Sequence, residues 1–221
     1  RISAGGINAS LLVHSIGLPP VLAIGSDEMK EKVAPAVLSG EKVHALAITE
    51  PSGGSDVANI KTRAKLEGDH YVVNGSKMFI SGAGETDVLV VMARTEADDS
   101  KTENQACKGA KGISAFVVPA NAAGISYGRK EPKMGWNSQP TRSITFENVS
   151  IPACHLLGEE GLGFTFAMKG LDGGRINIAT CSIGTAQQAL NQATQYIKER
   201  KQFAGLCARS KRENERKPVN A

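Results

Sequence analysis

The chain has 221 residues, of which 41% are hydrophobic and 22% charged, and its formal net charge at pH 7 is +4. This composition is ordinary for a globular protein with a sizeable core, and no apolar run approaches the roughly 18 residues of a membrane span. Most of the positive excess lies after Cys207, so the body is nearly neutral, and we expect neither nucleic acid nor a membrane as a partner.

Metal binding is disfavoured by the distribution of the usual ligands. The chain contains no CxxC, HxxxH or HExxH pattern, and its cysteines and histidines are scattered. Zinc sites need closely spaced pairs of such residues. Free thiols in a reducing compartment are the better interpretation of Cys107, Cys154, Cys181 and Cys207.

The N-terminal part, residues 1–42, is predicted to be helical and to end an N-terminal helical domain. Ser26 is a candidate N-cap, followed by two acidic residues and then by apolar residues at helical spacing. Pro19 and Pro20 are expected to break the chain before this helix, and Gly40 to end it.

Residues 43–155 are predicted to form a middle β-domain. The connections indicate hairpins, so we expect an antiparallel sheet or flattened barrel within an α+β fold. Asn74 and Gly75 are predicted to form a two-residue hairpin turn. The run 88–93 is continuously apolar and is expected to be buried on both faces, whereas the polar stretch 96–111 is expected to be an exposed loop. The predicted strands cover residues 43–49, 60–66, 71–73, 77–80, 88–93, 113–118, 125–127 and 143–146.

Residues 156–203 are predicted to begin a C-terminal helical bundle. From residue 176 the apolar positions alternate spacings of three and four, which is typical of a helix seam in a bundle. The seam comprises Ile176, Ala179, Ile183, Ala186, Leu190, Ala193 and Ile197. Such a seam needs partners, and the charged tail 204–221 offers none. We therefore expect the chain to be truncated.

The segment 49–56 is the strongest candidate for a ligand site. It follows an apolar run and combines two hydroxyl side chains, a proline and two adjacent glycines. Glycines allow close backbone approach, and hydroxyls and free N–H groups can grip an anionic or heteroaromatic group. A second strand end is predicted at residues 79–82. With the loop, it would allow Thr49, Ser55 and Ser81 to cradle a flat polar ring. For each loop alone, an ordinary polar turn is the favoured interpretation.

Two further candidates lie on the long helix. Arg175 stands near a helix start, against the preference of the helix dipole, and suits either a surface position or an anionic or carbonyl partner. The basic residues at 200–201 suit the dipole at a helix end, so a structural role alone would explain them.

These segments together resemble the acyl-CoA dehydrogenase family. The matching pieces are residues 47–56, 71–81, 135–142, 171–175 and 200–203, in the family's order and spacing. Residues 135–142 and 170–179 look most like the branch that acts on isobutyryl-CoA and other short branched chains. By this resemblance the chain is truncated at both ends.

The resemblance implies an FAD cofactor and an acyl-CoA substrate. Flavin-lining residues would be Leu46, Ala47, Ile48, Thr49 and Ser55, with Phe79, Ile80 and Ser81 beside them. Arg200, Lys201 and Gln202 would meet the FAD of a neighbouring subunit. The substrate would be bordered by Ser55, Asp172, Gly173, Gly174 and Arg175.

The family reaction is α,β-dehydrogenation of the thioester, with electrons passed to an electron-transfer flavoprotein. The full-length form would be a homotetramer, in the mitochondrial matrix of a eukaryote or the cytoplasm of a bacterium, and not secreted.

The chain departs from the family pattern at the catalytic base. Some members carry a glutamate immediately before the arginine that matches Arg175, where this chain has Gly174. Others carry it beyond residue 203, and from Ala204 onward we expect no resemblance. No catalytic residue is therefore assigned, since the motif gives neither Glu50 nor Glu85 the base role, and the chain alone is expected to be inactive. An acyl-CoA oxidase-like flavoenzyme and a non-catalytic flavin- or CoA-binding fragment are the alternatives.

Overall fold

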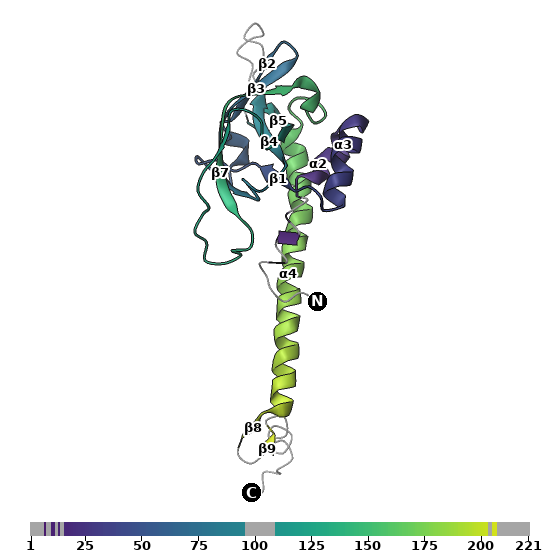
Figure 1. Cartoon of the computed structure of the whole chain (residues 1–221), viewed down its shortest axis with the longest axis vertical. Helices are drawn as coiled ribbons and strands as arrows, with labels where there is room; N and C mark the ends of the chain where they lie inside the picture. Colours follow the sequence, from purple (N-terminus) through teal and green to yellow (C-terminus); the bar gives the residue numbers. More distant parts are fainter. Residues whose placement is uncertain are drawn as a thin grey trace.

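The computed structural model describes residues 7, 10, 11, 13, 16–95, 109–202, 205 and 206 of the chain. A curled β-sheet forms the body, two short helices pack on one side of it, and one long helix projects away from it (Figure 1). The predicted α+β class, with N-terminal helices, a β-rich middle and a C-terminal helix, is confirmed. No helix among the described residues combines the length and apolar character needed to cross a membrane.

The two N-terminal helices follow local rules of capping. In α3 (Asp27–Leu38), the Ser26 side chain accepts a hydrogen bond from the Met29 N–H at 3.2 Å, so the predicted N-cap is confirmed. The expected break at Pro19 and Pro20 is wrong, because both lie in the first turn of α2 (Leu18–Ile24). A proline there loses no intrahelical hydrogen bond, and its fixed φ suits a helix start.

The sheet is mixed, with mostly antiparallel pairing. Its strand order is β1-β4-β2-β3-β7-β6, and β5 also pairs with β4. The β1–β4 and β2–β4 pairings are parallel. Hairpin connections alone were predicted from the sequence, so these parallel pairs were not expected. The strands are β1 (His44–Ala47), β2 (Arg63–Glu67), β3 (His70–Ser81), β4 (Val88–Thr95), β5 (Ile113–Pro119), β6 (Ile125–Tyr127) and β7 (Thr141–Pro152). Short 3-10 turns are η1 (Val57–Asn59), η3 (Gly109–Gly112) and η4 (Ala153–His155).

The hairpin predicted at Asn74 and Gly75 is wrong, because both residues lie inside the continuous strand β3. Gly75 has φ +147° and sits at a register shift in the pairing with β7. Asn74 exchanges hydrogen bonds with Asn148 across that pairing, which satisfies its amide without a turn. The two-residue turn lies instead between Glu67 and His70, where Gly68 has φ +65°.

Two apolar cores lie on opposite faces of the sheet. The concave core contains Tyr71, Phe116, Ile144 and Phe146, and the other core packs the sheet against the helices. Strand β4 contributes to both, with Leu89, Val91 and Ala93 in the concave core and Val90 and Met92 facing the helices. The prediction that run 88–93 is buried on both faces is confirmed. Most of the loop predicted at 96–111 lies outside the described residues.

The long helix α4 (Gly163–Glu199) begins against the sheet and then leaves it (Figure 1). A side chain at Gly163 would place its Cβ 2.5 Å from the Ser114 carbonyl carbon, so only glycine allows this close approach. Ala167 is buried in the helix-side core. Further along, the predicted seam is exposed, with Ile176 and Ile183 each 69% accessible. The short strands β8 (Lys201–Gln202) and β9 (Gly205–Leu206) follow the helix.

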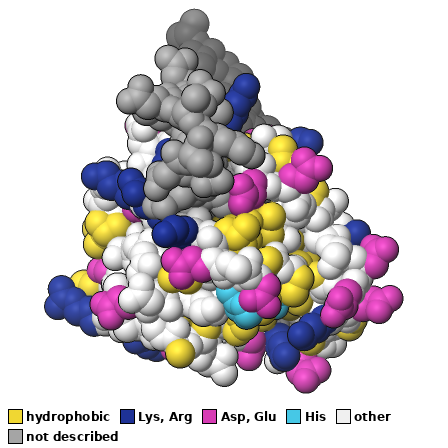
Figure 2. All heavy atoms as spheres, turned by 90° about the horizontal axis from the view of Figure 1, so that it is seen from above, with side chains coloured by type: hydrophobic (Ala, Val, Ile, Leu, Met, Phe, Trp, Pro, Cys, Tyr) yellow, Lys and Arg dark blue, Asp and Glu magenta, His cyan; other side chains and the backbone are white. Residues whose placement is uncertain are grey.

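Charged side chains of both signs surround the end of the molecule seen in Figure 2. Lysine and arginine alternate with aspartate and glutamate around the rim, between apolar and neutral polar side chains. This face therefore offers mixed charge, in keeping with the near-neutral body of the chain.

Replacing Gly75 by alanine will destabilise the protein more than the same change at Gly68. Both backbones have positive φ, but a Cβ at Gly75 would lie 2.6 Å from Thr62 Oγ1 and 2.7 Å from Thr62 Cα, whereas Gly68 has open space. We expect Gly68→Ala to cost about 1–2 kcal/mol and Gly75→Ala at least about 3 kcal/mol, because strain and overlap add. Urea titration measures both, and equal losses would contradict the clash.

The buried His44 will make the protein less stable in mild acid. Burial lowers the pKa of this imidazole to about 4, against opposing contributions from the Gly17 backbone and the charge of Asp87. The unfolded chain binds the proton from about pH 6.5, so stability is lost as pH falls from 6.5 to 4, by about 3 kcal/mol in all. Unfolding measured at pH 7 and pH 4.5 checks this. His44→Gln should flatten the dependence, and an unchanged slope would exclude His44 as its source.

Candidate functional site

The loop 49–56 is fixed in place beside strand β3. The Thr49 carbonyl accepts a hydrogen bond from Met78 N–H at 2.8 Å. Glu50 and Gly53 pair with each other through two backbone hydrogen bonds of 3.1 and 3.0 Å, which close a tight turn. Gly54 lies against the Thr49 side chain, since a Cβ there would come within 3.1 Å of Thr49 Cγ2. The sequence-predicted loop and the strand end at Phe79–Ser81 are thus brought together.

A buried ion pair anchors this arrangement. Lys77 and Glu50 side chains are 0% and 3% exposed, and their Nζ and Oε1 atoms lie 2.8 Å apart. The ammonium also donates to the Ile48 carbonyl at 3.0 Å. The Glu50 carboxylate accepts from the backbone N–H groups of Lys61 at 2.6 Å and Thr62 at 2.9 Å. These hydrogen bonds join β1, the loop, the start of β2 and β3 at one point.

Charge is retained on both members of the pair at neutral pH. Burial disfavours the ionised Glu50, but the charge of Lys77 and the hydrogen bonds outweigh it and hold the pKa of Glu50 below its ordinary value. Burial lowers the pKa of Lys77 to about 8, against the attraction of Glu50. Because that value lies above 7, Lys77 remains mostly protonated. Glu50 therefore serves as an anchor and is not a free base.

Phe79 is held in a strained backbone conformation near the C-terminal end of β3. Its φ is +58°, and it falls in an irregularity of the β3–β7 register between Lys77 and Ile80. Such a conformation costs of order 1–3 kcal/mol for a non-glycine residue and is common at functional sites. The result is an aromatic side chain that is 56% exposed beside a buried Ile80. A bulge here re-aims the aromatic ring away from the core.

A hollow of about 540 Å³ lies next to Ser81, which is one of its lining residues together with Lys133, Trp136 and Thr141. Lys133 organises this region, because its ammonium donates to the Trp136 carbonyl at 3.0 Å, to Thr141 Oγ1 at 3.1 Å and to the Gln139 carbonyl. Trp136 also has a positive φ, +55°, and is 45% exposed. Two strained, exposed aromatic residues thus occur near Ser81: Phe79 precedes it by two residues on β3, and Trp136 lines the same hollow.

The predicted flavin-lining residues differ in what they can present to a ligand. Ala47, Ile48 and Ile80 are buried in the two cores, so their side chains support the site from behind. Leu46 is half-buried against the helix-side core. The accessible groups are the half-buried hydroxyls of Thr49 and Ser81 and the exposed side chains of Ser55 and Phe79.

The predicted substrate residues lie where α4 leaves the body of the protein. Leu171 still packs on the helix-side core, and the next turn is exposed. Asp172 and Arg175 pair with each other one turn apart, through a hydrogen bond from Arg175 Nη1 to Asp172 Oδ1. Gly173 and Gly174 have open space at their Cα positions. This turn therefore offers a smooth, charge-flanked helix surface.

Within one chain, the loop 49–56 is far from the predicted flavin-contacting residues Arg200, Lys201 and Gln202. They follow α4 at the end remote from the sheet (Figure 1). At roughly 1.5 Å per residue, Arg200 lies about 40 Å beyond Asp172 along the helix. Arg200 donates to the Tyr196 hydroxyl at 2.6 Å and lies over its ring. Any contact of these residues with the loop 49–56 would require a second copy of the chain.

Sequence reasoning missed Lys77, Lys133 and Trp136 as parts of the site. One signal could have identified Lys77. It is a charged residue at a position of strand β3 that is buried, and Glu50 in the loop is a carboxylate that could pair with it. The left-handed conformation of Trp136 had no signal at the level of single residues. No group of three or more His, Cys, Asp or Glu residues in the described parts of the chain could hold a metal ion.

Two family models match this sequence. The acyl-CoA dehydrogenase middle domain matches residues 45–149, and the acyl-CoA dehydrogenase C-terminal domain matches residues 161–211. Together they cover more than half of the chain and include both the loop and α4. The second match extends beyond Ala204, so the expectation that all resemblance ends there is wrong.

Curated relatives agree with these matches. The chain is 44% identical over 195 residues to isobutyryl-CoA dehydrogenase, mitochondrial, of Dictyostelium discoideum, covering 88% of this chain and 45% of that protein. It is 43% identical over 202 residues to the mitochondrial isobutyryl-CoA dehydrogenase of Bos taurus, covering 91% and 46%. It is 44% identical over 179 residues to a short-chain specific acyl-CoA dehydrogenase of Clostridium acetobutylicum, covering 81% and 45%. The chain thus spans about half the length of the curated relatives it matches.

Solved structures share the fold. Butyryl-CoA dehydrogenase from Megasphaera elsdenii superposes with a TM-score of 0.84 at 36% identity, covering 96% of this chain and 54% of that one. A structure described as the electron transferring flavoprotein of Acidaminococcus fermentans matches with a TM-score of 0.79 at 37% identity, covering 95% and 52%.

Replacing Lys77 by methionine will test the anchoring role of the ion pair. The change leaves the Glu50 carboxylate buried without its counter-charge, and we expect a loss of about 3–5 kcal/mol in unfolding free energy. The double variant Lys77→Met with Glu50→Gln should recover part of that loss, since no buried charge remains. Lys65→Met is the matched control, because Lys65 is 61% exposed. Urea unfolding that gives similar values for the Lys77 and Lys65 variants would refute the anchor.

Proposed function

Since this chain belongs to the acyl-CoA dehydrogenase family, we propose that it forms part of an FAD-dependent oxidoreductase. The reaction is α,β-dehydrogenation of an acyl-CoA thioester with a short or branched acyl group, such as isobutyryl-CoA. The observation that carries the proposal is the fixed loop 49–56, held by the buried Glu50–Lys77 pair against the strained Phe79–Ser81 strand end. The names of the matched relatives support the choice of substrate class.

The residues around Thr49 fit a flat polar ring. Hydroxyls of Thr49 and Ser81 come from neighbouring strand ends, an open backbone lies at Gly53, and an exposed aromatic side chain stands at Phe79. FAD, when bound, supplies the acceptor for the hydride that leaves the β-carbon. In this proposal Thr49 and Ser81 orient the ring by hydrogen bonds, and Phe79 limits access of water to it. The buried Ala47, Ile48 and Ile80 and the half-buried Leu46 hold these groups in position.

The substrate is proposed to lie between Ser55 and the turn 172–175 of α4. Ser55 offers an exposed hydroxyl at the end of the loop. Gly173 and Gly174 permit close approach to the helix, and Asp172 and Arg175 provide charge at its edge. An arginine beside a thioester can stabilise negative charge that develops on the carbonyl oxygen during removal of the α-proton.

We propose that this chain alone does not complete the reaction, because the candidate carboxylates are engaged elsewhere. Glu50 is fully hydrogen-bonded within its anchor. Glu85 pairs with Lys130 at 2.7 Å on the surface. Gly174 has no side chain to accept a proton. Removal of the α-proton needs a positioned base, and none of these residues provides one.

The assembly and partners follow from the same family membership. We propose residues 43–155 as the middle domain and 156–203 as the first part of the C-terminal bundle, after a helical segment 1–42 and before a basic tail 204–221. In a homotetramer, Arg200, Lys201 and Gln202 would reach the FAD of a neighbouring copy. The proposed electron acceptor is an electron-transfer flavoprotein, in the mitochondrial matrix of a eukaryote or the cytoplasm of a bacterium. The description of one structural neighbour supports that partner.

The proposal is tested by cofactor retention and by turnover. We expect the purified chain to quench FAD fluorescence, and Thr49→Val with Ser81→Ala to weaken FAD binding at least tenfold. Ser52→Ala is the matched control, because Ser52 is exposed in the same loop. Addition of isobutyryl-CoA should shift the flavin absorbance spectrum without reducing a dye acceptor.

Two results would contradict the proposal. Equal FAD affinity of the Thr49/Ser81 variant and the Ser52 variant would remove the loop from the cofactor site. Sustained dye reduction with isobutyryl-CoA would show that the chain contains a base that we have not assigned.

A further inference from the structure

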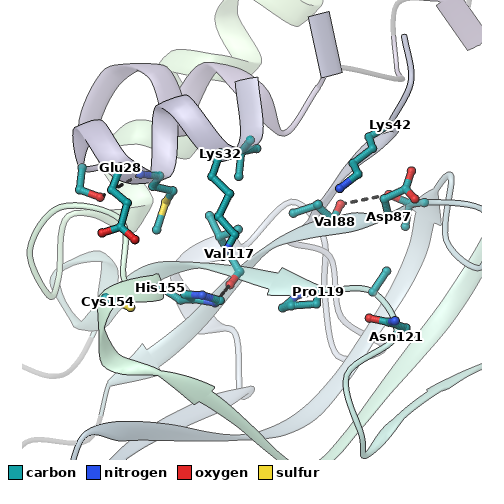
Figure 3. Close-up of a pocket in the computed structure, with 15 residues that line it drawn as sticks. Glu28, Lys32, Lys42, Asp87, Val88, Val117, Pro119, Asn121, Cys154 and His155 are labelled. Atoms are coloured by element: carbon teal, nitrogen blue, oxygen red, sulfur yellow. Dashed lines mark hydrogen bonds between the residues drawn. The ribbon is translucent and has the colours of Figure 1, made fainter. Parts of the chain in front are cut away.

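A second cavity, of about 440 Å³, lies between helix α3 and the edge of the sheet. Its walls come from the first turns of α3, the start of β4, the end of β5 with the following turn, and η4 (Figure 3). None of its lining residues belongs to the loop 49–56, the strand end at Phe79–Ser81 or the hollow beside Ser81. The volume falls in the range of pockets that bind small molecules.

The floor of this cavity is apolar. It is formed by side chains from both packed layers, namely Met29, Val33, Val88, Val117, Pro119 and Ala120. Met29 and Val117 belong to the helix-side core, so the floor is continuous with a rigid part of the protein. A hydrocarbon or ring surface placed here would lose contact with water and gain about 25 cal/mol for each Å² buried.

Two ammonium groups stand over this floor without bonded partners. Lys32 extends from α3 down toward Val117, and Lys42 extends over Val88 (Figure 3). Neither ammonium group makes a hydrogen bond or an ion pair with any residue in the described parts of the chain. The nearby Asp87 carboxylate accepts a hydrogen bond from Val43 N–H at 2.9 Å. Glu28 lies at the other end of the cavity, above Cys154, and Asp87 is the carboxylate beside Lys42 (Figure 3).

His155 adds a neutral acceptor to the wall. Its Nδ1 lies 2.9 Å from the Val117 carbonyl, and this contact assigns the proton to Nδ1 and leaves Nε2 as an acceptor. Burial lowers the pKa of His155, and the charge of Lys32 lowers it further, although the Val117 hydrogen bond opposes both. The imidazole is therefore uncharged at neutral pH and does not add to the attraction for anions.

We propose that this cavity binds a small amphipathic carboxylate, with its apolar body on the floor and its carboxylate between Lys32 and Lys42. The apolar floor explains a requirement for a hydrocarbon or ring, and the two unpaired ammonium groups explain a requirement for negative charge. Because both lysines are exposed at the rim, the charge contribution will weaken as salt is added. A site of this kind needs no residue of the proposed dehydrogenase centre.

The test uses 2-naphthoate as a probe of the purified chain. Binding is followed by ligand-observed NMR, and occupancy of the cavity by protection of Cys154 from iodoacetamide, mapped by mass spectrometry. Cys154 is exposed and lines the cavity, while Cys181 lies on α4 and serves as the internal control. We expect the probe to slow alkylation of Cys154 at least threefold and to leave Cys181 unchanged.

Variants separate the two parts of the site. Lys32→Ala with Lys42→Ala should weaken 2-naphthoate binding at least tenfold, whereas Lys30→Ala, on the same helix but outside the cavity, should not. Val33→Trp should fill the floor and abolish protection of Cys154 while keeping both charges. The neutral analogue 2-naphthylmethanol should bind at least tenfold more weakly than 2-naphthoate.

Two outcomes would overturn the proposal. One is the absence of Cys154 protection at probe concentrations that saturate the NMR signal, which would place binding elsewhere, such as on the exposed face of α4. The other is unchanged affinity in the double lysine variant, which would show that the cavity does not select for the carboxylate.

Discussion

The buried pair of Glu50 and Lys77 is the interaction on which the candidate site depends. It brings two charges out of water at a single point, and such a pair persists only when its remaining hydrogen-bonding groups are satisfied. Here the backbone of Ile48, Lys61 and Thr62 satisfies them. Residues 48–50, 61–62 and 77, which are separate in sequence, are therefore joined at one point. The loop 49–56 cannot move without exposing or unpairing a charge. The rigidity of the loop follows from this cost.

Two aromatic residues of the candidate site have strained backbones. Phe79 and Trp136 occupy left-handed backbone conformations that a bulky side chain avoids in a relaxed chain. The surrounding structure supplies the compensation, through the β3–β7 ladder on one side and the hydrogen bonds of Lys133 on the other. Folding free energy gained elsewhere therefore holds Phe79, on the same strand as Ser81, and Trp136, in the lining of the hollow beside Ser81, in these conformations. That distribution of strain is independent support for a ligand site at this edge of the sheet.

The sequence carried the signals that depend on neighbours along the chain. The Ser26 cap, the doubly buried strand β4 and the helical character of residues 176–197 follow from periodicity and local chemistry, and the structure confirms them. The helix start expected near Arg175 is wrong, because α4 runs without a break from Gly163 to Glu199. The prediction of a hairpin at Asn74 and Gly75 was wrong because contacts with distant residues favour a bulge over a turn. Thr62 lies close to Gly75, and Asn148 is hydrogen-bonded to Asn74. The parallel pairings of β1 and β2 with β4 likewise join strands that no hairpin connects. The sequence identified the residues of the motifs, but it did not reveal the buried Glu50–Lys77 ion pair that holds the loop in place.

The pairing of β3 with β7 has a consequence for how the protein is made. Tyr71 pairs with Ile151, and Ser81 with Thr141, so one of the longest ladders of the sheet joins segments far apart in the chain. Closing such a long loop is entropically costly before any contact forms, and topologies rich in distant pairings fold slowly. During synthesis the edge of β3 remains open until β7 leaves the ribosome. The nascent chain therefore spends that interval with an unpaired strand edge, which is the period in which chaperones would have most to protect.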